Sequence, residues 1–175
     1  MFPVFRSQSV YNLVYPFPST AASASIAAAG GAGNTQVRRM FPDKYFIGST
    51  INGTVYNTVA GAGGANIIGT PFTDLPDPSP PAVTGNSWYS SSLVLVQFQI
   101  NQAFDCDTPY PWSTKIGTGR QPHVLAIPIV VRPNSDTMWN LVNNSAAAIA
   151  GSITIEGMLV DKNEYEAWVA RTVGK

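Results

Sequence analysis

Two side chains with catalytic potential occur once each in the sequence, the thiol of Cys106 and the imidazole of His123. A thiolate and an imidazole act as nucleophile and base when the fold brings them within hydrogen-bonding reach. Cys106 lies in a proline-rich segment and His123 opens an apolar run, so a loop and a strand start could meet. Because only residue identity supports the pair, we interpret His123 as a polar strand-end residue and Cys106 as a small apolar side chain in a loop.

Acidic side chains offer a second kind of chemistry, the binding of a calcium ion through carboxylate oxygens. Asp105 and Asp107 are two positions apart, and Asp74, Asp77 or Asp161 would have to complete the site. The sequence contains no 12-residue calcium loop that would fix the spacing of these ligands. We therefore expect solvated loop acids, with no metal ion and no cofactor.

Two glycine-rich segments share residues with nucleotide-binding loops. The first, GAGGAN at residues 61–66, follows a predicted hairpin and opens no helix, so it lacks the βαβ frame of a dinucleotide site. The second, Gly117-Thr-Gly119-Arg120, lacks the Lys-Ser/Thr pair of a phosphate loop. Among the ten acidic residues no pair stands out for sugar hydrolysis. We predict that the protein is not an enzyme.

Charged residues make up 11% of the 175 residues, and ten basic side chains balance ten acidic ones. A chain without net charge has no long-range field to attract a phosphate backbone or an anionic lipid surface. The N-terminus does not resemble a secretory signal, and no apolar run is long enough for a membrane span. We expect a soluble protein made in a host cytoplasm, with neither nucleic acid nor membrane as a partner.

The elements that must position these residues are predicted to be short antiparallel strands. Apolar side chains alternate with Gln97 and Gln99 in the clearest strand, residues 91–102. Residues 123–131 are apolar on both parities, which is typical of a strand buried on both faces, although Pro128 indicates an edge or a bulge. Further strands are expected at 137–143 and 152–160.

Two other local patterns complete the predicted fold. Asn52-Gly53 favours a type I′ turn and so a hairpin over residues 50–60. Residues 163–172 have helical spacing, and Asn163 with Glu166 resembles a capping box. The predicted fold is all-β, an antiparallel β-sandwich or jelly roll with one short C-terminal helix.

The N-terminal segment is predicted to lie outside this sandwich. Residues 1–20 interleave aromatic residues with prolines, which favours extended backbone, and residues 21–34 are rich in Ala and Gly. We therefore divide the chain into an extended N-terminal arm and linker, residues 1–34, and a β domain, residues 35–175. The aromatic residues of the arm are expected to dock on neighbouring subunits; they are Phe2, Phe5, Tyr11, Tyr15 and Phe17.

Three segments near the C-terminus resemble the closing strand pair of many small tailed-phage virion proteins. They are Pro128-Ile-Val-Val-Arg132-Pro133-Asn-Ser-Asp-Thr137, Asn143-Asn144-Ser145 and Ile153-Thr-Ile155-Glu156-Gly157. In those proteins a strand ends at a proline-containing turn, an N-x-S-like segment bridges two strands, and the last strand finishes on a hydrophobic, polar and glycine step. The loop FDCDTPYPWSTKIGTGRQP also fits. The resemblance covers residues 91–161 and includes neither the arm, the linker nor the C-terminal helix.

The resemblance implies a jelly-roll-like fold and a structural place in a virus particle. We predict a non-enzymatic virion structural protein, most simply a phage capsid decoration (cement) or minor capsid component. Its partners would be copies of itself, as a dimer or trimer that covers free strand edges, and other capsid proteins. The alternative is a carbohydrate-binding or receptor-binding module of a phage fibre or spike. Its stacking surfaces would be Trp88, Tyr89, Tyr110 or Trp112.

Overall fold

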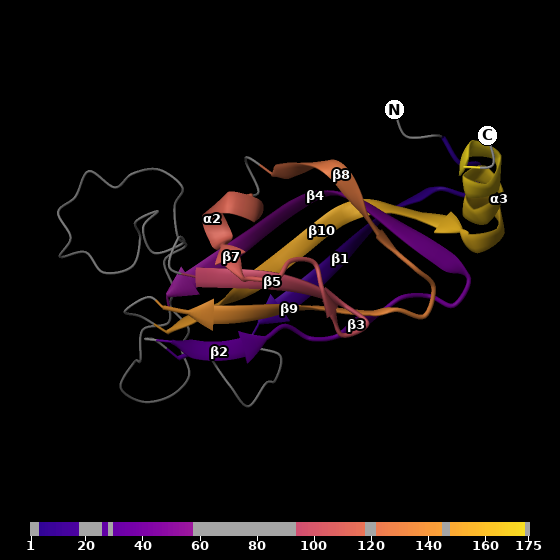
Figure 1. Ribbon diagram of the computed structural model, residues 1–175. Coiled ribbons are helices and arrows are strands. Elements are labelled where there is room, and N and C mark those ends of the chain that lie inside the picture. The colour runs from indigo at the N-terminus through magenta and orange to yellow at the C-terminus, as the bar shows by residue number, and fades with distance from the viewer. Residues whose placement is uncertain are drawn as a thin grey trace.

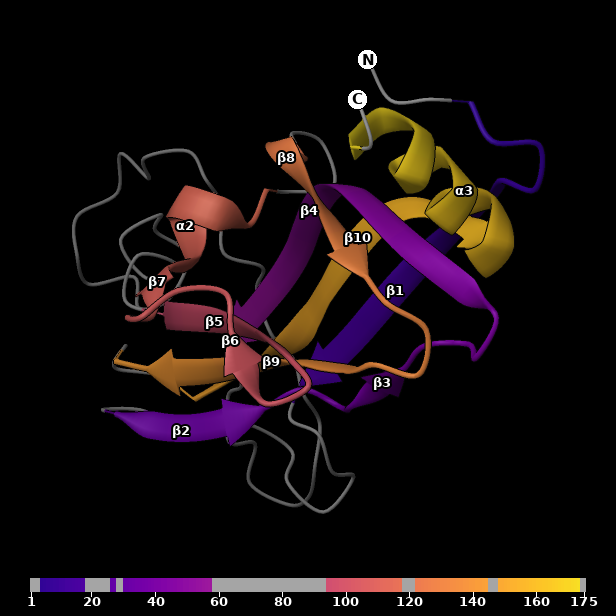
Figure 2. The same ribbon diagram turned by 45° about the vertical axis from the view of Figure 1, so that its right-hand side comes forward.

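Two antiparallel sheets pack face to face in the computed structural model, which describes residues 4–17, 26–27, 30–57, 94–117, 122–144 and 148–173 (Figures 1 and 2). The first sheet has the order β1 (Ser9–Phe17), β10 (Ile149–Asp161), β4 (Lys44–Asn57) and β8 (His123–Val131). The second sheet has the order β2 (Gly31–Asn34), β9 (Asp136–Asn143), β5 (Val94–Ile100) and β6 (Ala103–Phe104). Two short strands extend it, β3 (Arg38–Arg39) on β9 and β7 (Tyr110–Pro111) on β5.

Two helices accompany the sheets in the described residues, α2 (Trp112–Lys115) and α3 (Lys162–Val173). The first is a single turn that follows β7, and the second directly follows β10. The predicted all-β sandwich with a short C-terminal helix is therefore confirmed.

The strand pairs are nested along the chain. β1 pairs with β10, the last strand, and β2 and β3 pair with β9. β4 pairs with β8, and β5 pairs with β6 and β7. Contacts of β10 with β4 and of β9 with β5 then complete the two sheets. The described strands thus follow one long antiparallel hairpin that is wrapped into two layers.

Alternating side chains fill the space between the sheets. In β9 every second residue is buried, including Trp139 and Leu141. β5 directs Val94, Val96 and Phe98 into the same core, as its sequence predicts, and residues of β1, β4 and β10 face them. Burial of this apolar surface is the main favourable contribution to folding.

A polar link crosses the core between the sheets. The hydroxyl of Tyr15 on β1 lies 2.8 Å from that of Thr137 on β9, and Thr137 donates a hydrogen bond to the Arg38 carbonyl at 3.0 Å. Because the Thr137 proton points to Arg38, Tyr15 must be the donor to Thr137. Burial raises the pKa of Tyr15, so its hydroxyl keeps the proton that this link requires.

The segment predicted to be an arm is part of the fold, and this prediction was wrong. β1 runs in register with β10 from the pair Ser9 and Leu159 to the pair Phe17 and Gly151. Residues 31–34 form β2 in the second sheet, so the predicted boundary at residue 34 does not divide the described residues into two units. Pro16 misled the prediction because it lies on a sheet edge, where its missing N–H faces away from the neighbouring strand.

The predicted hairpin at Asn52-Gly53 was also wrong, because β4 continues through both residues. Gly53 lies opposite Ile153 of β10. A Cβ atom at Gly53 would lie 2.7 Å from a ring carbon of Trp112 and 2.8 Å from a methyl carbon of Ile116. The glycine therefore allows the α2 region to approach the strand closely, and it serves no turn.

Helix α3 covers one end of the outer face of the first sheet. Phe5, Ile47 and Val160 form a buried cluster there, and Tyr165 and Trp168 of the helix pack against it. The helix begins one residue before the predicted start. The predicted capping box was wrong, because Asn163 is the second residue of the helix and does not precede it. The Glu166 carboxylate accepts a hydrogen bond from the Tyr45 hydroxyl at 3.2 Å.

Candidate functional site

Cys106 lies in the loop between β6 and β7 of the second sheet, whereas His123 belongs to the first sheet. Cys106 follows β6, and its Sγ lies 3.0 Å from the carbonyl oxygen of Thr108. His123 starts β8, opposite Ile51 of β4. Both are among the described residues, and no hydrogen bond joins them. Partial burial and the neighbouring carboxylate of Asp105 raise the pKa of Cys106, which favours the thiol over the reactive thiolate. The structure does not bring this pair together.

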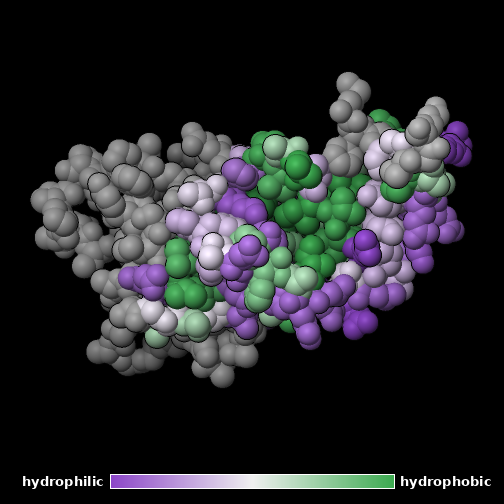
Figure 3. All heavy atoms as spheres, viewed as in Figure 1, coloured by the Kyte–Doolittle hydropathy of each residue, from purple (hydrophilic) through white to green (hydrophobic). Residues whose placement is uncertain are grey.

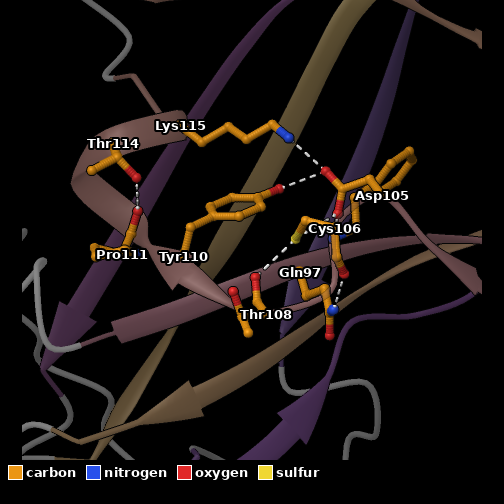
Figure 4. A network of polar contacts seen from close by, with 9 residues as sticks. Gln97, Asp105, Cys106, Thr108, Tyr110, Pro111, Thr114 and Lys115 are labelled. Atoms are coloured by element: carbon orange, nitrogen blue, oxygen red, sulfur yellow. Dashed lines mark hydrogen bonds and ion pairs between the residues drawn. The ribbon is translucent and has the colours of Figure 1, made fainter.

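A polar network centred on Asp105 holds the segment that follows β5 (Figure 4). One carboxylate oxygen accepts a hydrogen bond from the backbone N–H of Phe98 at 3.0 Å. The other accepts hydrogen bonds from the Tyr110 hydroxyl at 2.9 Å and the Lys115 ammonium at 2.5 Å. The ammonium nitrogen also lies 4.4 Å from the centre of the Tyr110 ring. Asp105 therefore connects β5, β7 and α2.

We call the contacts of Asp105 with Phe98, Tyr110 and Lys115 the Asp105 clamp, and the protonation state of Tyr110 favours them. Burial and the Asp105 carboxylate raise the pKa of Tyr110, so this hydroxyl stays protonated and donates. The side chain of Gln97 on β5 donates a hydrogen bond to the carbonyl of Cys106 at 2.6 Å, so it holds the same segment. This segment lies over Gln97, which is only 8% exposed. The sequence contains no motif for this network, because its members meet only after β5, β7 and α2 have formed.

The acidic residues considered as calcium ligands have other partners or lie outside the described residues. Asp105 pairs with Lys115, and Asp161 pairs with Lys44. Asp74 and Asp77 lie outside the described residues. Within the described part of the chain, no group of three or more His, Cys, Asp or Glu side chains is placed to hold a metal ion.

The N-terminal aromatic residues predicted to contact partners pack within their own chain. Phe5, Tyr15 and Phe17 are 3%, 0% and 3% exposed, so they offer no free surface to a neighbour, and their predicted role was wrong. Tyr11 is half-buried, with its ring edge against Phe41 at a centroid distance of 5.8 Å. Phe2 lies outside the described residues.

The aromatic residues predicted to stack on a ligand are also engaged, as far as they are described. Trp112 is 4% exposed, and its ring packs against Phe17, so its prediction as a stacking surface was wrong. Tyr110 is half-buried beneath the Lys115 ammonium. Trp88 and Tyr89 lie outside the described residues.

The exposure of the apolar side chains of β8 was also predicted wrongly. The strand was predicted to be buried on both faces, but Val124 and Ile127 are 70% and 84% exposed. β8 is an edge strand of the first sheet, as Pro128 indicated. Its register with β4 is interrupted between Gly48 and Thr50, so the middle of β8 leaves the ladder. Figure 3 shows apolar residues gathered over β8 and toward α3.

The opposite edge of the first sheet is closed by other parts of the chain. The side chain of Arg38 donates a hydrogen bond to the Val14 carbonyl at 2.7 Å, and the backbone N–H of Gln36 donates to the Pro16 carbonyl at 3.3 Å. Both carbonyls belong to β1 and point away from β10. At this edge, two of the outward carbonyls are therefore paired within the chain.

Comparisons of the chain with protein-family models, with curated proteins and with solved structures find no match. In the part of the chain that the structure describes, no helix combines the length and apolar character needed to cross a membrane. The function is therefore inferred from the fold and from the surface that β8 exposes.

Proposed function

We propose that the protein is a non-enzymatic structural protein of a virus particle, and that it acts by binding copies of itself and other capsid proteins. The nested strand pairing carries this proposal. Pairing of the first strand with the last, and of each later strand with its counterpart from the other end, is the order that defines a jelly roll. We infer this topology from the pairings, and jelly rolls are frequent in viral capsid domains.

The surface of the sandwich supports assembly as the mode of action. None of the nine side chains of β8 is an acid, a lysine or an arginine, and its exposed members, Val124, Ala126 and Ile127, are all apolar. Exposed apolar surface of this kind is typical of protein contact sites. Because Phe5, Tyr15 and Phe17 are buried within their own chain, we assign the contact surface to β8 and not to an arm.

The side chains that could take part in a reaction also support a structural role, because they are engaged in contacts within the chain. The Asp105 carboxylate accepts hydrogen bonds from three parts of the chain, and the Cys106 thiol donates to a backbone carbonyl. These contacts hold a loop against β5. A fold that serves as a contact surface requires this kind of rigidity and no reactive group.

The proposal is tested by mass spectrometry of virus particles purified from a culture whose viral genome encodes this chain. We expect the chain to co-purify with the particles in a fixed ratio to the major capsid protein through density-gradient centrifugation and a high-salt wash. Its presence only in the soluble fraction of infected cells would contradict a structural role. Particles assembled without the coding sequence serve as the control for contamination.

A further inference from the structure

A groove lies on the outer face of the second sheet, near the turn that joins β5 to β6. Gln99 of β5 lies opposite Met138 of β9, and both alternate along their strands with residues of the core. Asp136, two residues before Met138, and Val37, just before β3, also line the groove, which has a volume of about 360 Å³. The turn and β3 lie at the same end of β9 (Figure 2). Three segments distant in sequence therefore surround one surface depression.

The side chain of Gln99 provides a nearly buried hydrogen-bond donor. Its oxygen accepts a hydrogen bond from the Asn140 amide at 3.2 Å, which fixes the orientation of the Gln99 amide. Gln99 is only 9% exposed and lines the groove, and within the described residues no hydrogen bond reaches its amide nitrogen. A donor in this position is costly to leave without a partner. An oxygen atom of a ligand in the groove would supply the missing acceptor.

The carboxylate of Asp136 provides an acceptor across the groove from this donor. Its side chain is 49% exposed, and its ion pair with Arg39 is long, at 3.9 Å. The backbone N–H of Asp136 donates to the Asn101 side chain at 2.8 Å, which holds this end of β9 against the turn after β5. Because Gln99 lies opposite Met138, Gln99 and Asp136 are diagonal neighbours. Such neighbours are about 7–8 Å apart, so a single ring-shaped ligand can reach both.

The rest of the groove determines the charge and shape of a suitable ligand. Met138 and Val37 add an apolar surface, and Val37 is 56% exposed. Asp136 repels an anion, whereas the N–H groups of Gln99 and the guanidinium of Arg39 disfavour a cation. The ligand should therefore be neutral, with groups that both donate and accept hydrogen bonds and with one apolar face. A pyranose sugar has these properties, because its hydroxyl groups surround a ring whose C–H groups form an apolar face.

We propose that this groove binds a neutral pyranose sugar. One hydroxyl group of the sugar would accept a hydrogen bond from the Gln99 amide nitrogen, and a second would donate to the Asp136 carboxylate. A C–H face of the ring would pack against Met138. The site is distinct from Tyr110 and Trp112, which were predicted as stacking surfaces and which pack within the chain. Sugar binding goes beyond the proposed assembly role and does not depend on it, because it is a property of the isolated chain.

The first test titrates the full chain with the methyl pyranosides of glucose, galactose, mannose and N-acetylglucosamine, and follows amide signals by NMR. We expect at least one of them to bind with a millimolar dissociation constant, because a single ring makes few contacts, and to shift the side-chain amide signals of Gln99. Sorbitol has similar hydroxyl groups but no ring, so it should bind at least about tenfold more weakly. Absence of saturable shifts at Gln99 with all four sugars, or equal binding of sorbitol, would overturn the proposal.

The second test measures the same dissociation constant for variants of the groove. Asp136→Asn keeps the size of a half-exposed side chain and removes its charge, so it should raise the dissociation constant at least about fivefold. Gln99→Glu keeps an oxygen for Asn140 but loses the donor, and it should raise the constant at least about tenfold. Asp107→Asn, at an exposed position outside the groove, is the matched control and should bind as the wild type does. Circular dichroism checks that each variant is folded, and Asp136→Asn alone decides if Gln99→Glu is not. Equal losses in Asp136→Asn and Asp107→Asn would contradict the site.

Discussion

β1 and β8 are the two edges of the first sheet, and each is rich in apolar residues and contains a proline. β1 buries Leu13, Tyr15 and Phe17, whereas β8 exposes Val124 and Ile127. In β1 the larger apolar side chains fall on one parity, so a single face carries them all into the core. In β8 they fall on both parities, and an edge strand of a two-layer sandwich can bury only one of its faces. Apolar content therefore predicts burial less well than its period does.

The largest expected effect that tests this difference is Tyr15→Ala in β1. We expect the free energy of unfolding to fall by about 3–5 kcal/mol, because a cavity opens beside Phe98 and Thr137 loses its donor. Urea denaturation followed by tryptophan fluorescence measures the change. Val14→Ala is the control on the same strand, since Val14 is 43% exposed, and it should alter stability by no more than about 0.5 kcal/mol. Similar losses for both variants would show that β1 does not alternate between core and solvent.

A smaller loss of stability is expected from a substitution in the loop that follows β6 than from one in β1. Asp105→Ala removes the acceptor for Tyr110, Lys115 and the Phe98 N–H, and it should lower the free energy of unfolding by about 1–2 kcal/mol. The loosened segment should also expose Cys106, so its reaction with a thiol reagent should become faster. Asp107→Ala, on the same segment at an exposed position, serves as the control. Unchanged thiol reactivity in Asp105→Ala would contradict the clamp.

The contact between residues 6–7, which precede β1, and Glu164 of α3 should weaken in acid, whereas the pairing of β1 with β10 should not change with pH. The Ser7 hydroxyl and the backbone N–H groups of Arg6 and Ser7 donate to the Glu164 carboxylate and hold its pKa below its ordinary value. Because the folded pKa is lowered, this contact contributes stability above the unfolded pKa and loses it as pH falls through the folded pKa. We expect acid to detach residues 4–8 from α3 locally.

Amide hydrogen exchange, expressed as protection relative to the unfolded chain, measures this detachment. Protection of the Arg6 and Ser7 amides should fall in acid, and Glu164→Gln should remove most of that pH dependence. Protection of Leu13, within β1, should stay constant over the same range. Parallel loss at Leu13 would mean that the loop and the strand open together.

The sequence predicted those elements whose signals are local. The alternation in residues 94–100 and the helical spacing of residues 163–172 both match the structure, because each pattern depends only on neighbouring residues. Asn52-Gly53 misled the prediction because glycine also serves close packing, here with Trp112. The contacts of Asp105 could not be predicted, because they join β5, β7 and α2, which meet only through the strand order.

The smallest expected effect lies within β8 itself. Ile127→Ala should change the free energy of unfolding by less than about 0.5 kcal/mol at low protein concentration, because Ile127 is 84% exposed and little of its surface leaves the solvent on folding. Val131→Ala, on the same strand and with 0% exposure, should be clearly destabilising because it leaves a cavity against Phe46. Thermal melts of both variants at low protein concentration test the pair. A comparable loss for Ile127→Ala would show that the middle of β8 packs within the monomer, and the side chain would then be unavailable to a second copy.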